Sequence, residues 1–252
     1  MTNPDHRRAG GEQHRDSLPW SVAPHLPTDD KDPDMSNTLT SSPAADVLAR
    51  LYTNAERSHR EHQERLAAVP PEQRPQTTNS REFFAAAKDL YMAVRPDTSR
   101  LLYILTRTRR ARTIVEFGTS FGVSTLCLAA GLRDNGGGRV IGTEYEPTKA
   151  AAARASLAEA GLVDLVEIRE GDALETLAGD LPDQVDILFL DGAKEMYLDV
   201  VKLVEPNLSP GALLVVDNSN RSPELLAYLR DSEDYLPTAV ADDVTVALRT
   251  TP

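Results

Sequence analysis

The spacing of apolar residues predicts three helices in the first half of the chain. From Pro43 onward, apolar positions recur at intervals of three and four residues and predict one long helix that stops at the prolines at 70 and 71. This helix carries the charged run ERSHREHQERLAAV, which indicates that most of it is solvated. A second helix is expected after Asn79 or Ser80, with Phe83, Phe84, Leu90, Tyr91 and Met92 on it, and a third after Pro96, with Leu101, Leu102, Ile104 and Leu105 on its apolar side.

After Arg112 the pattern changes to short apolar runs that alternate with helical stretches. The runs are TIVEF, RVIGTE, LVEIRE, VDILFLD and ALLVVDN. Strands that alternate with helices predict a parallel sheet covered by helices on both faces. The helical stretch LLAYLR and two further strand-like runs, YLPTAV and VTVALRT, then end the chain. We therefore predict an α/β fold with a doubly wound sheet of seven strands, mostly parallel and with a C-terminal antiparallel hairpin.

The same pattern suggests how the chain is organised. Residues 1–42 are polar and proline-rich without an apolar period, and we expect a disordered tail, in which Met35 could be the true start of the protein. Residues 43–110 are expected to form N-terminal helices that pack on a core of residues 111–252, so that residues 43–252 make one domain.

Composition and charge exclude several classes of protein. Of the 252 residues, 40% are hydrophobic and 26% charged, and no stretch approaches the roughly 20 apolar residues of a membrane helix. The single cysteine, Cys127, excludes an internal disulfide, and a net charge of -12 disfavours nucleic acid as a partner. The basic run RTRRAR is assigned to a helix end, and His59 with His62 to a hydrated helix face. We expect a soluble, cytoplasmic protein that binds neither nucleic acid nor a membrane.

Acidic residues stand at the ends of five consecutive predicted strands. In open α/β sheets, ligands bind beyond the carboxyl ends of the strands, so these positions are the expected binding site. The acidic residues are Glu116, Glu144, Asp172, Asp191 and Asp217.

The first of these acids precedes a glycine turn, VEFGTSFGVST, between a strand and a helix. Its glycines, Gly118 and Gly122, are one residue further apart than those of the dinucleotide fingerprint. A phosphate here would face Glu116, whereas an ammonium group would be favoured, so the expected ligand carries a positive charge. A turn with a purely structural role is the alternative.

The next two strand ends carry acids that suit a nucleoside. Glu144 lies where a strand-end acid holds the two hydroxyls of a ribose, and Asp172 could accept a hydrogen bond from an adenine amino group. Glu146, beside Pro147, is instead assigned to charge complementarity with the start of a helix.

Together, the glycine turn, the ribose acid and EGDAL resemble the S-adenosylmethionine-dependent methyltransferases of the Rossmann-like class, from about residue 90 to the C-terminus. The resemblance implies that the cationic ligand is the methionine ammonium group of the cofactor. The segment YMAV also resembles the family segment that lines the cofactor methyl group. The implied cofactor-binding residues are Met92, Val94, Glu116, Gly118, Thr119, Ser120, Gly122, Ser124, Glu144, Tyr145, Asp172, Ala173 and Asp191.

Two further segments, FLDGAKEMYLD and PGALLVVDN, resemble the catechol O-methyltransferase family. This resemblance implies that Asp191, Asp217 and Asn218 bind Mg²⁺ and that Lys194 is the general base. Hard oxygen ligands suit Mg²⁺, and a phenol hydroxyl bound to the ion loses its proton more easily. A surface ion pair between Asp191 and Lys194 is the alternative.

The sequence also departs from the catechol enzymes. They have His-Trp where this chain has Gly192 and Ala193, their substrate-binding glutamate falls at Leu236, and the segment after Asn218 is short. These differences suggest a larger hydroxylated aromatic acceptor than catechol.

We therefore predict an O-methyltransferase that acts, with Mg²⁺ and a lysine base, on a vicinal hydroxyl of an aromatic small molecule. The alternatives are a metal-independent small-molecule methyltransferase and a catalytically silent S-adenosylmethionine-binding protein. A nicotinamide dehydrogenase is disfavoured by the glycine spacing and because all five histidines lie within the first 62 residues. The long N-terminal helix could pair with a second copy to form a homodimer.

Overall fold

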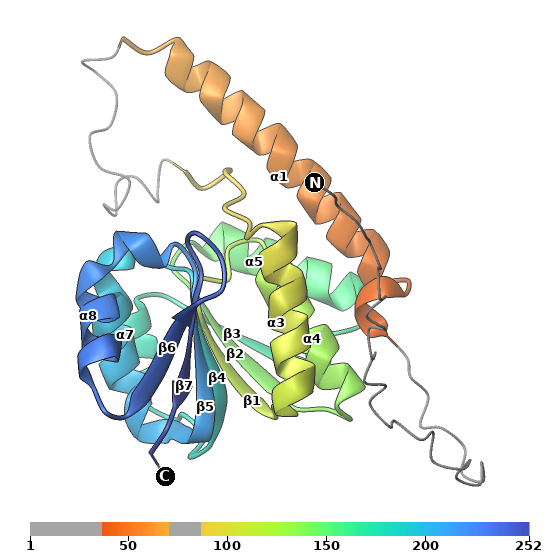
Figure 1. Ribbon diagram of the computed structural model, residues 1–252. Coiled ribbons are helices and arrows are strands. Elements are labelled where there is room, and N and C mark those ends of the chain that lie inside the picture. The colour runs from red at the N-terminus through yellow and green to blue at the C-terminus, as the bar shows by residue number, and fades with distance from the viewer. Residues whose placement is uncertain (1–36, 71–86, 252) are drawn as a thin grey trace, which may run out of the picture. The chain divides into compact units, whose positions relative to one another are not determined.

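A seven-stranded mixed sheet forms the centre of the computed structural model, which describes residues 37–70 and 87–251 (Figure 1). Five strands are parallel, and β7 lies antiparallel between β5 and β6 in the order β3-β2-β1-β4-β5-β7-β6. The predicted fold class is confirmed. The strands are β1 (Thr113–Phe117), β2 (Arg139–Glu144), β3 (Val166–Glu170), β4 (Val185–Leu190), β5 (Leu208–Val216), β6 (Tyr235–Ala239) and β7 (Thr245–Arg249).

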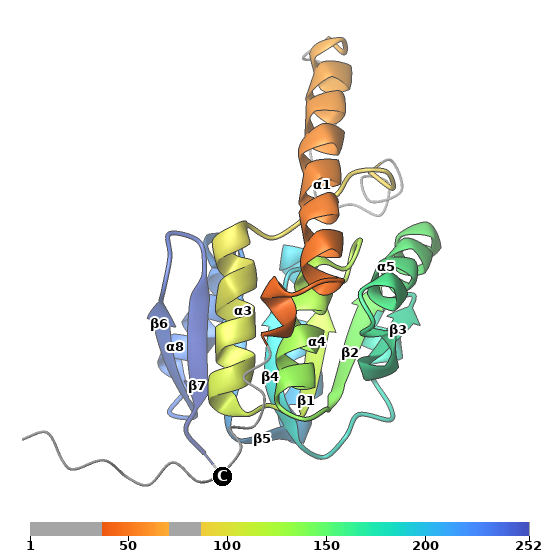
Figure 2. The same ribbon diagram turned by 90° about the vertical axis from the view of Figure 1, so that its right-hand side faces the viewer.

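Helices cover both faces of the sheet, and Figure 2 shows α3, α4 and α5 side by side on one of them. That face is covered by α1 (Ala44–Ala67), α3 (Pro96–Arg109), α4 (Val123–Asp134) and α5 (Pro147–Glu159), and the other by α6 (Ala173–Thr176), α7 (Tyr197–Val204) and α8 (Pro223–Asp231). Short 3-10 turns are η1 (Thr38–Thr40), η3 (Val163–Leu165), η4 (Lys194–Met196), η5 (Glu205–Asn207) and η6 (Ser219–Arg221). None of the helices in the described ranges is long and apolar enough to cross a membrane.

The order of the strands determines where a ligand can bind. The chain runs from β1 outward to β2 and β3, and then returns to the other side of β1 to form β4. Because the connections leave β1 and β4 in opposite directions, a crevice opens at their carboxyl ends. These two strands are buried on both faces, which explains their nearly continuous apolar sequences.

The long helix and the third helix are confirmed, but the predicted apolar side of the third is partly wrong. Ile104 of α3 is 55% exposed, whereas Leu102 and Thr106 are buried. A Cβ atom added to Gly131 of α4 would lie 2.6 Å from the Thr106 methyl group. The two helices therefore approach closely through small residues, and this contact turns Ile104 toward solvent.

The predicted second helix does not continue into residues 87–95, and residues 71–86 lie outside the described part. Leu90 closes a turn onto Ala87, and residues 90–95 then run without regular structure. The backbone N–H of Tyr91 donates to Oγ of Ser58 on α1 (3.1 Å) instead of forming a helical bond. Arg95 is extended because the following proline disfavours the helical conformation.

Residues 37–42, which the sequence assigned to a disordered tail, are instead folded against the helices. The buried carboxylate of Asp134, with 1% side-chain exposure, accepts hydrogen bonds from Thr38 N (3.0 Å), Thr38 Oγ1 and Tyr103 Oη (2.6 Å). Arg107 lies 3.3 Å from the same carboxylate. One buried acid thus joins η1, α3 and α4. Residues 1–36, including Met35, lie outside the described residues.

We expect Asp134→Ala to lower the free energy of unfolding by about 3 kcal/mol, because hydrogen bonds to a charged, buried group contribute about 1.5–3 kcal/mol each and partly overlap. Urea denaturation measures the change. Asp97→Ala is the matched control, because Asp97 forms an ion pair with Arg100 on α3 but is 93% exposed, and we expect a loss below about 0.5 kcal/mol. Equal losses in the two variants would contradict the anchoring role of Asp134.

Candidate active site

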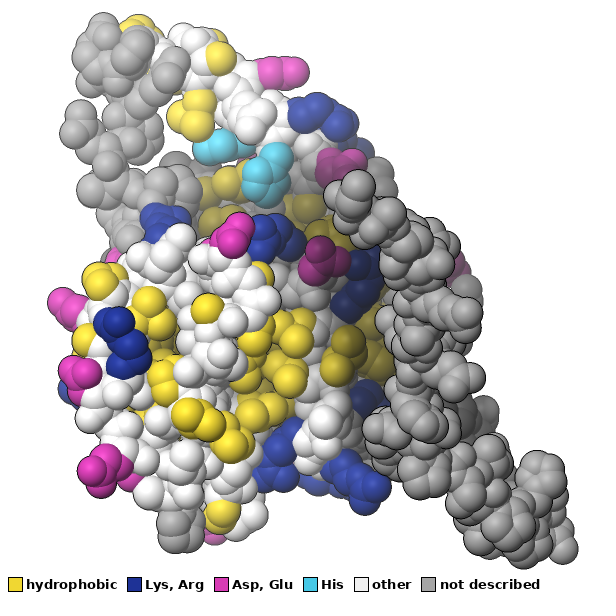
Figure 3. Space-filling view, in the orientation of Figure 1, with side chains coloured by type: hydrophobic (Ala, Val, Ile, Leu, Met, Phe, Trp, Pro, Cys, Tyr) yellow, Lys and Arg dark blue, Asp and Glu magenta, His cyan; other side chains and the backbone are white. Residues whose placement is uncertain are grey.

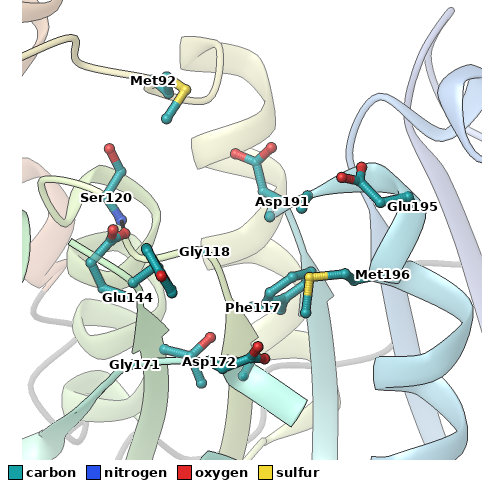
Figure 4. A pocket seen from close by; sticks show the side chains of 15 residues that line it. Met92, Phe117, Gly118, Ser120, Glu144, Gly171, Asp172, Asp191, Glu195 and Met196 are labelled. Atoms are coloured by element: carbon teal, nitrogen blue, oxygen red, sulfur yellow. Dashed lines mark hydrogen bonds between the residues drawn. The ribbon is translucent and has the colours of Figure 1, made fainter. Parts of the chain in front are cut away.

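A cavity of about 260 Å³ lies at the carboxyl ends of β1, β2, β3 and β4 (Figure 4). A smaller cavity of about 10 Å³ shares Met92 and Ser120 with it. Of the predicted cofactor residues, the larger cavity is lined by Met92, Gly118, Ser120, Glu144, Tyr145, Asp172, Ala173 and Asp191, and the smaller one also by Val94, Thr119 and Ser124. Glu116 and Gly122 line neither cavity. Glu116 precedes the glycine turn, and Gly122 is part of it.

The glycine turn brings β1 and β4 into close contact. Gly118 has a φ of +100°, and a Cβ atom there would lie 2.7 Å from the backbone oxygen of Asp191. Only glycine fits this position, because both its conformation and its surroundings exclude a side chain. Gly122, with a φ of +89°, starts α4. The close approach places Asp191 directly beside the turn.

Glu116 is a fully buried acid behind the glycine turn. Its Oε2 accepts hydrogen bonds from Thr119 Oγ1 (3.0 Å) and from Thr125 Oγ1. Its Oε1 has no well-formed hydrogen bond within the described part of the chain. Burial raises the pKa of Glu116 to about 7, although nearby hydroxyls, that of Ser124 first, partly offset this effect. A positively charged ligand would satisfy the free oxygen and stabilise the ionised form.

Glu144 is held rigidly at the cavity by two backbone amides. Its Oε2 accepts from Ser120 N (2.7 Å) and its Oε1 from Glu146 N (2.9 Å). A carboxylate oxygen can accept more than one hydrogen bond, so both oxygens can still receive hydroxyl groups. This geometry suits the predicted ribose contact.

The other two acids near these strand ends act as helix caps. Asp172 caps α6 by accepting from Leu174 N (3.0 Å), and it also lines the cavity. Glu146 caps α5 by accepting from Thr148 N (3.3 Å), as its predicted role at a helix start requires. The suggested adenine contact of Asp172 stays a prediction.

Asp191 and Lys194 form a buried ion pair and not a surface one. Lys194 Nζ donates to Asp191 Oδ1 at 2.9 Å, and the exposed fractions of the two side chains are 9% and 13%. The ammonium group also lies 5.2 Å from the ring centroid of Tyr197. The phenol of Tyr197 donates to the backbone oxygens of Leu190 (3.0 Å) and Asp217 (3.1 Å), and so ties the ends of β4 and β5 together.

The carboxyl groups of Asp217 and Asp191 lie near enough to influence each other's ionisation. Burial raises the pKa of both groups, that of Asp217 to about 7 with the Asp191 charge as the second cause, while Lys194 partly opposes the rise for Asp191. Two carboxylates that are largely shielded from water and repel each other are a donor set that a divalent cation would neutralise.

The third predicted metal ligand, Asn218, follows Asp217 directly and takes the left-handed conformation (φ 49°) that asparagine tolerates better than most residues. Within the described ranges, no three His, Cys, Asp or Glu side chains gather in a way that could hold a metal ion. The predicted set has two carboxylates and one amide, so Mg²⁺ binding stays a prediction. His59, which the sequence assigned to a hydrated helix face, has its Nδ1 2.9 Å from the backbone oxygen of Ala55 on the same helix.

Comparison with known proteins identifies the family. The family model described as "Methyltransferase domain" matches residues 115–219. The crystal structure of the O-methyltransferase TomG from Streptomyces achromogenes, in complex with S-adenosylmethionine, is 30% identical, and the match covers 69% of this chain and 87% of TomG with a TM-score of 0.56. The chain belongs to the S-adenosylmethionine-dependent O-methyltransferases.

The chain is also similar to two catechol O-methyltransferases. That of Mycobacterium tuberculosis is 35% identical over 142 residues, and that of Niastella koreensis 33% identical over 138 residues. The matches cover 56% and 54% of this chain but only 64% and 62% of the relatives, slightly less than two thirds. The Bacillus cereus O-methyltransferase structure, at 23% identity and a TM-score of 0.59 over 80% of this chain and all of the other, shows the shared fold.

Some residues that line the cavity were not predicted from the sequence. Phe117, Glu195 and Met196 line the cavity together with Gly192 and Ala193. Phe117 is the last residue of an apolar strand, and the sequence therefore predicts a core residue at this position and not a cavity residue. Glu195 and Met196 follow Lys194 within one turn, and their proximity to a predicted site residue was the available signal.

The buried Glu116 gives a pH-dependent stability that can be measured. Its pKa in the folded state, about 7, lies above the unfolded value of 4.5. The folded state therefore binds the proton more tightly, and stability falls as the pH rises from 4.5 to about 7. Since one pKa unit corresponds to about 1.4 kcal/mol, the loss approaches about 3 kcal/mol.

We expect Glu116→Gln without ligand to be more stable than the native protein at pH 8, with a difference that shrinks toward pH 5. Urea unfolding at several pH values tests this. Parallel stability curves for the two proteins would show that Glu116 carries no buried charge.

Proposed function

We propose that this protein transfers the methyl group of S-adenosylmethionine to a hydroxyl of a catechol-like or other vicinal-hydroxyl aromatic small molecule. One observation carries the proposal: the buried side chains of Lys194 and Asp217 and the nearly buried carboxyl group of Asp191 lie together beside a cavity at the strand ends. The activity named for the relatives from M. tuberculosis and N. koreensis supports the acceptor class.

The cofactor would lie across the ends of β1, β2 and β3. The TomG and B. cereus structures hold S-adenosylmethionine and S-adenosylhomocysteine, respectively, which supports this choice. We place the methionine ammonium group near Oε1 of Glu116, which lacks a hydrogen bond within the described residues. The ribose hydroxyls would bind Glu144, and the adenine would lie near Asp172, which also lines the cavity.

A divalent cation such as Mg²⁺ would be held by Asp191, Asp217 and Asn218. When bound, it would supply a positive charge that makes an acceptor hydroxyl more acidic. The residues fit this role, because the two carboxyl groups are largely shielded from water, influence each other's ionisation and have raised pKa values without a cation. Vicinal hydroxyls offer two oxygens to the same site, which is why the acceptor class has adjacent hydroxyl groups.

Lys194 would remove the proton of the reacting hydroxyl. Its amine is held by Asp191 and lies against the Tyr197 ring in a site shielded from water. An Asp191 shared with a cation would pair less strongly with Lys194 and leave the amine able to accept a proton. The acceptor oxygen then bonds to the methyl carbon, the carbon–sulfur bond breaks, and S-adenosylhomocysteine leaves while Lys194 holds the proton. Positioning and electrostatics would supply most of the rate.

A metal-independent reaction is the second candidate. It is favoured by the direct Asp191–Lys194 ion pair, which already gives Asp191 a positively charged partner. A methyl-transfer screen of diphenols, run after EDTA treatment and again with Mg²⁺ restored, separates the two. Activity only with Mg²⁺ supports the first, activity that survives EDTA supports the second, and cofactor binding without turnover supports a silent binding protein. The proposed homodimer is tested by light scattering.

We expect Asp217→Ala to abolish Mg²⁺-dependent turnover and to leave S-adenosylmethionine binding within about twofold, because Asp217 does not line the cofactor cavity. Asp199→Ala, at an exposed position of α7, is the control and should keep full activity. Loss of both turnover and cofactor binding would point to misfolding and would remove the support for a metal ligand.

We expect Lys194→Ala to lower kcat by about 10² to 10⁴, the range of a lost general base, with partial recovery at high pH where the acceptor ionises by itself. Lys202→Ala removes an exposed lysine that lies over Tyr228, and serves as the control. A pH–rate profile that stays unchanged in Lys194→Ala would exclude Lys194 as the base.

A further inference from the structure

The ring of Phe117 lies directly against the backbone of Gly192. A Cβ atom built on Gly192 would come within 2.5 Å of both Cε1 and Cζ of that ring. Real Cβ atoms do not approach a neighbour so closely, so any other residue at position 192 would displace the ring. The aromatic ring at the end of β1 therefore depends on the glycine after β4.

The ring is fixed from a second side by Tyr197. The two ring centroids lie 6.1 Å apart with an interplanar angle of 73°, a favourable edge-on contact. Tyr197 is fully buried and its hydroxyl is bonded to two strand ends, so it cannot move aside. Phe117 is only 6% exposed, yet it lines the cavity.

The surroundings of this wall have the chemistry of a purine site. Met196 and Ala173 line the same cavity as apolar neighbours of Phe117, and the carboxylate of Asp172 stands at the edge of the lining (Figure 4). An adenine has apolar faces and an edge with an amino donor, which matches an apolar wall beside an acceptor. Glu144, which we assign to the ribose, lines the cavity as well.

We infer that Phe117, together with Met196, forms the apolar wall against which the adenine of the cofactor binds, and that Gly192 is required to seat this ring. The inference rests on the proposed function. Phe117 at the end of β1 would thus supply an aromatic surface to a site whose residues after β4, Gly192 and Ala193, have none. Phe117 is thus a positioning residue and takes no part in the chemical step.

The test compares two ligands by calorimetry: S-adenosylhomocysteine, and 5′-methylthioadenosine, which has the nucleoside but no amino acid. We expect Phe117→Ala to weaken both ligands by a similar factor of about 10 to 100, the range for lost stacking on a base. Glu116→Gln should weaken S-adenosylhomocysteine and leave 5′-methylthioadenosine unchanged. A purely structural defect would not separate the ligands in this way.

Two results would overturn the inference: a Phe117→Ala protein that binds 5′-methylthioadenosine as the native protein does, or one that loses S-adenosylhomocysteine alone. If the native protein binds neither ligand, the proposed function itself fails. Phe117→Leu is the second variant should the alanine protein not fold, with a smaller loss in both ligands. Phe189→Leu is the matched control, because Phe189 is a buried ring on β4 that does not line the cavity.

The contact with Gly192 gives a second, independent test. Gly192→Ala should weaken 5′-methylthioadenosine in the native background, because the new methyl group displaces the ring. In the Phe117→Leu background the same change should cost at least threefold less, since the smaller side chain leaves room, on the general rule that residues in contact are not additive. Equal losses in both backgrounds would show that Gly192 does not act through Phe117.

Discussion

Buried negative charge at the carboxyl edge of the sheet is the constraint on which the site depends. Glu116 and Asp217 are buried, Asp191 is nearly so, and Lys194 is the one cation paired with them among the described residues. Removing a carboxylate from water is costly unless a partner compensates it. The site therefore favours positively charged ligands, and an ammonium group, a sulfonium and a divalent cation all meet that condition. Their binding would stabilise the folded state.

The backbone makes this concentration of charge possible. Because Gly118 has no side chain, the end of β1 lies against the backbone of Asp191. Because Gly192 has none either, the Phe117 ring lies against the backbone of Gly192. Tyr197 then ties β4 to β5 through two carbonyl oxygens, and the charge of Asp191 at the end of β4 acts on the carboxyl group of Asp217 at the end of β5. Cofactor wall, lysine and carboxylates are thus parts of one packed unit, so a change in one of them is expected to affect the others.

Much of the fold could be predicted from the sequence because buried parallel strands leave a strong local signal. The strand-end position of the acids followed from the same signal, since the topology gathers these ends at one edge. Contacts between distant residues could not be predicted in this way. Thr38 is folded onto Asp134, 96 positions away, and Ile104 is turned outward by a glycine of another helix. Phe117 looked like a core residue because only the glycine at position 192 makes it part of a cavity wall.

The central claim is that the two strand-end carboxylates hold a divalent cation beside the acceptor. A titration with Mn²⁺, followed by electron paramagnetic resonance on the protein saturated with S-adenosylhomocysteine, tests it most directly. We predict one bound ion per chain, displaced by Mg²⁺ and lost in Asp191→Asn and Asp217→Asn. Absence of bound Mn²⁺, or binding that both variants retain, would contradict the account.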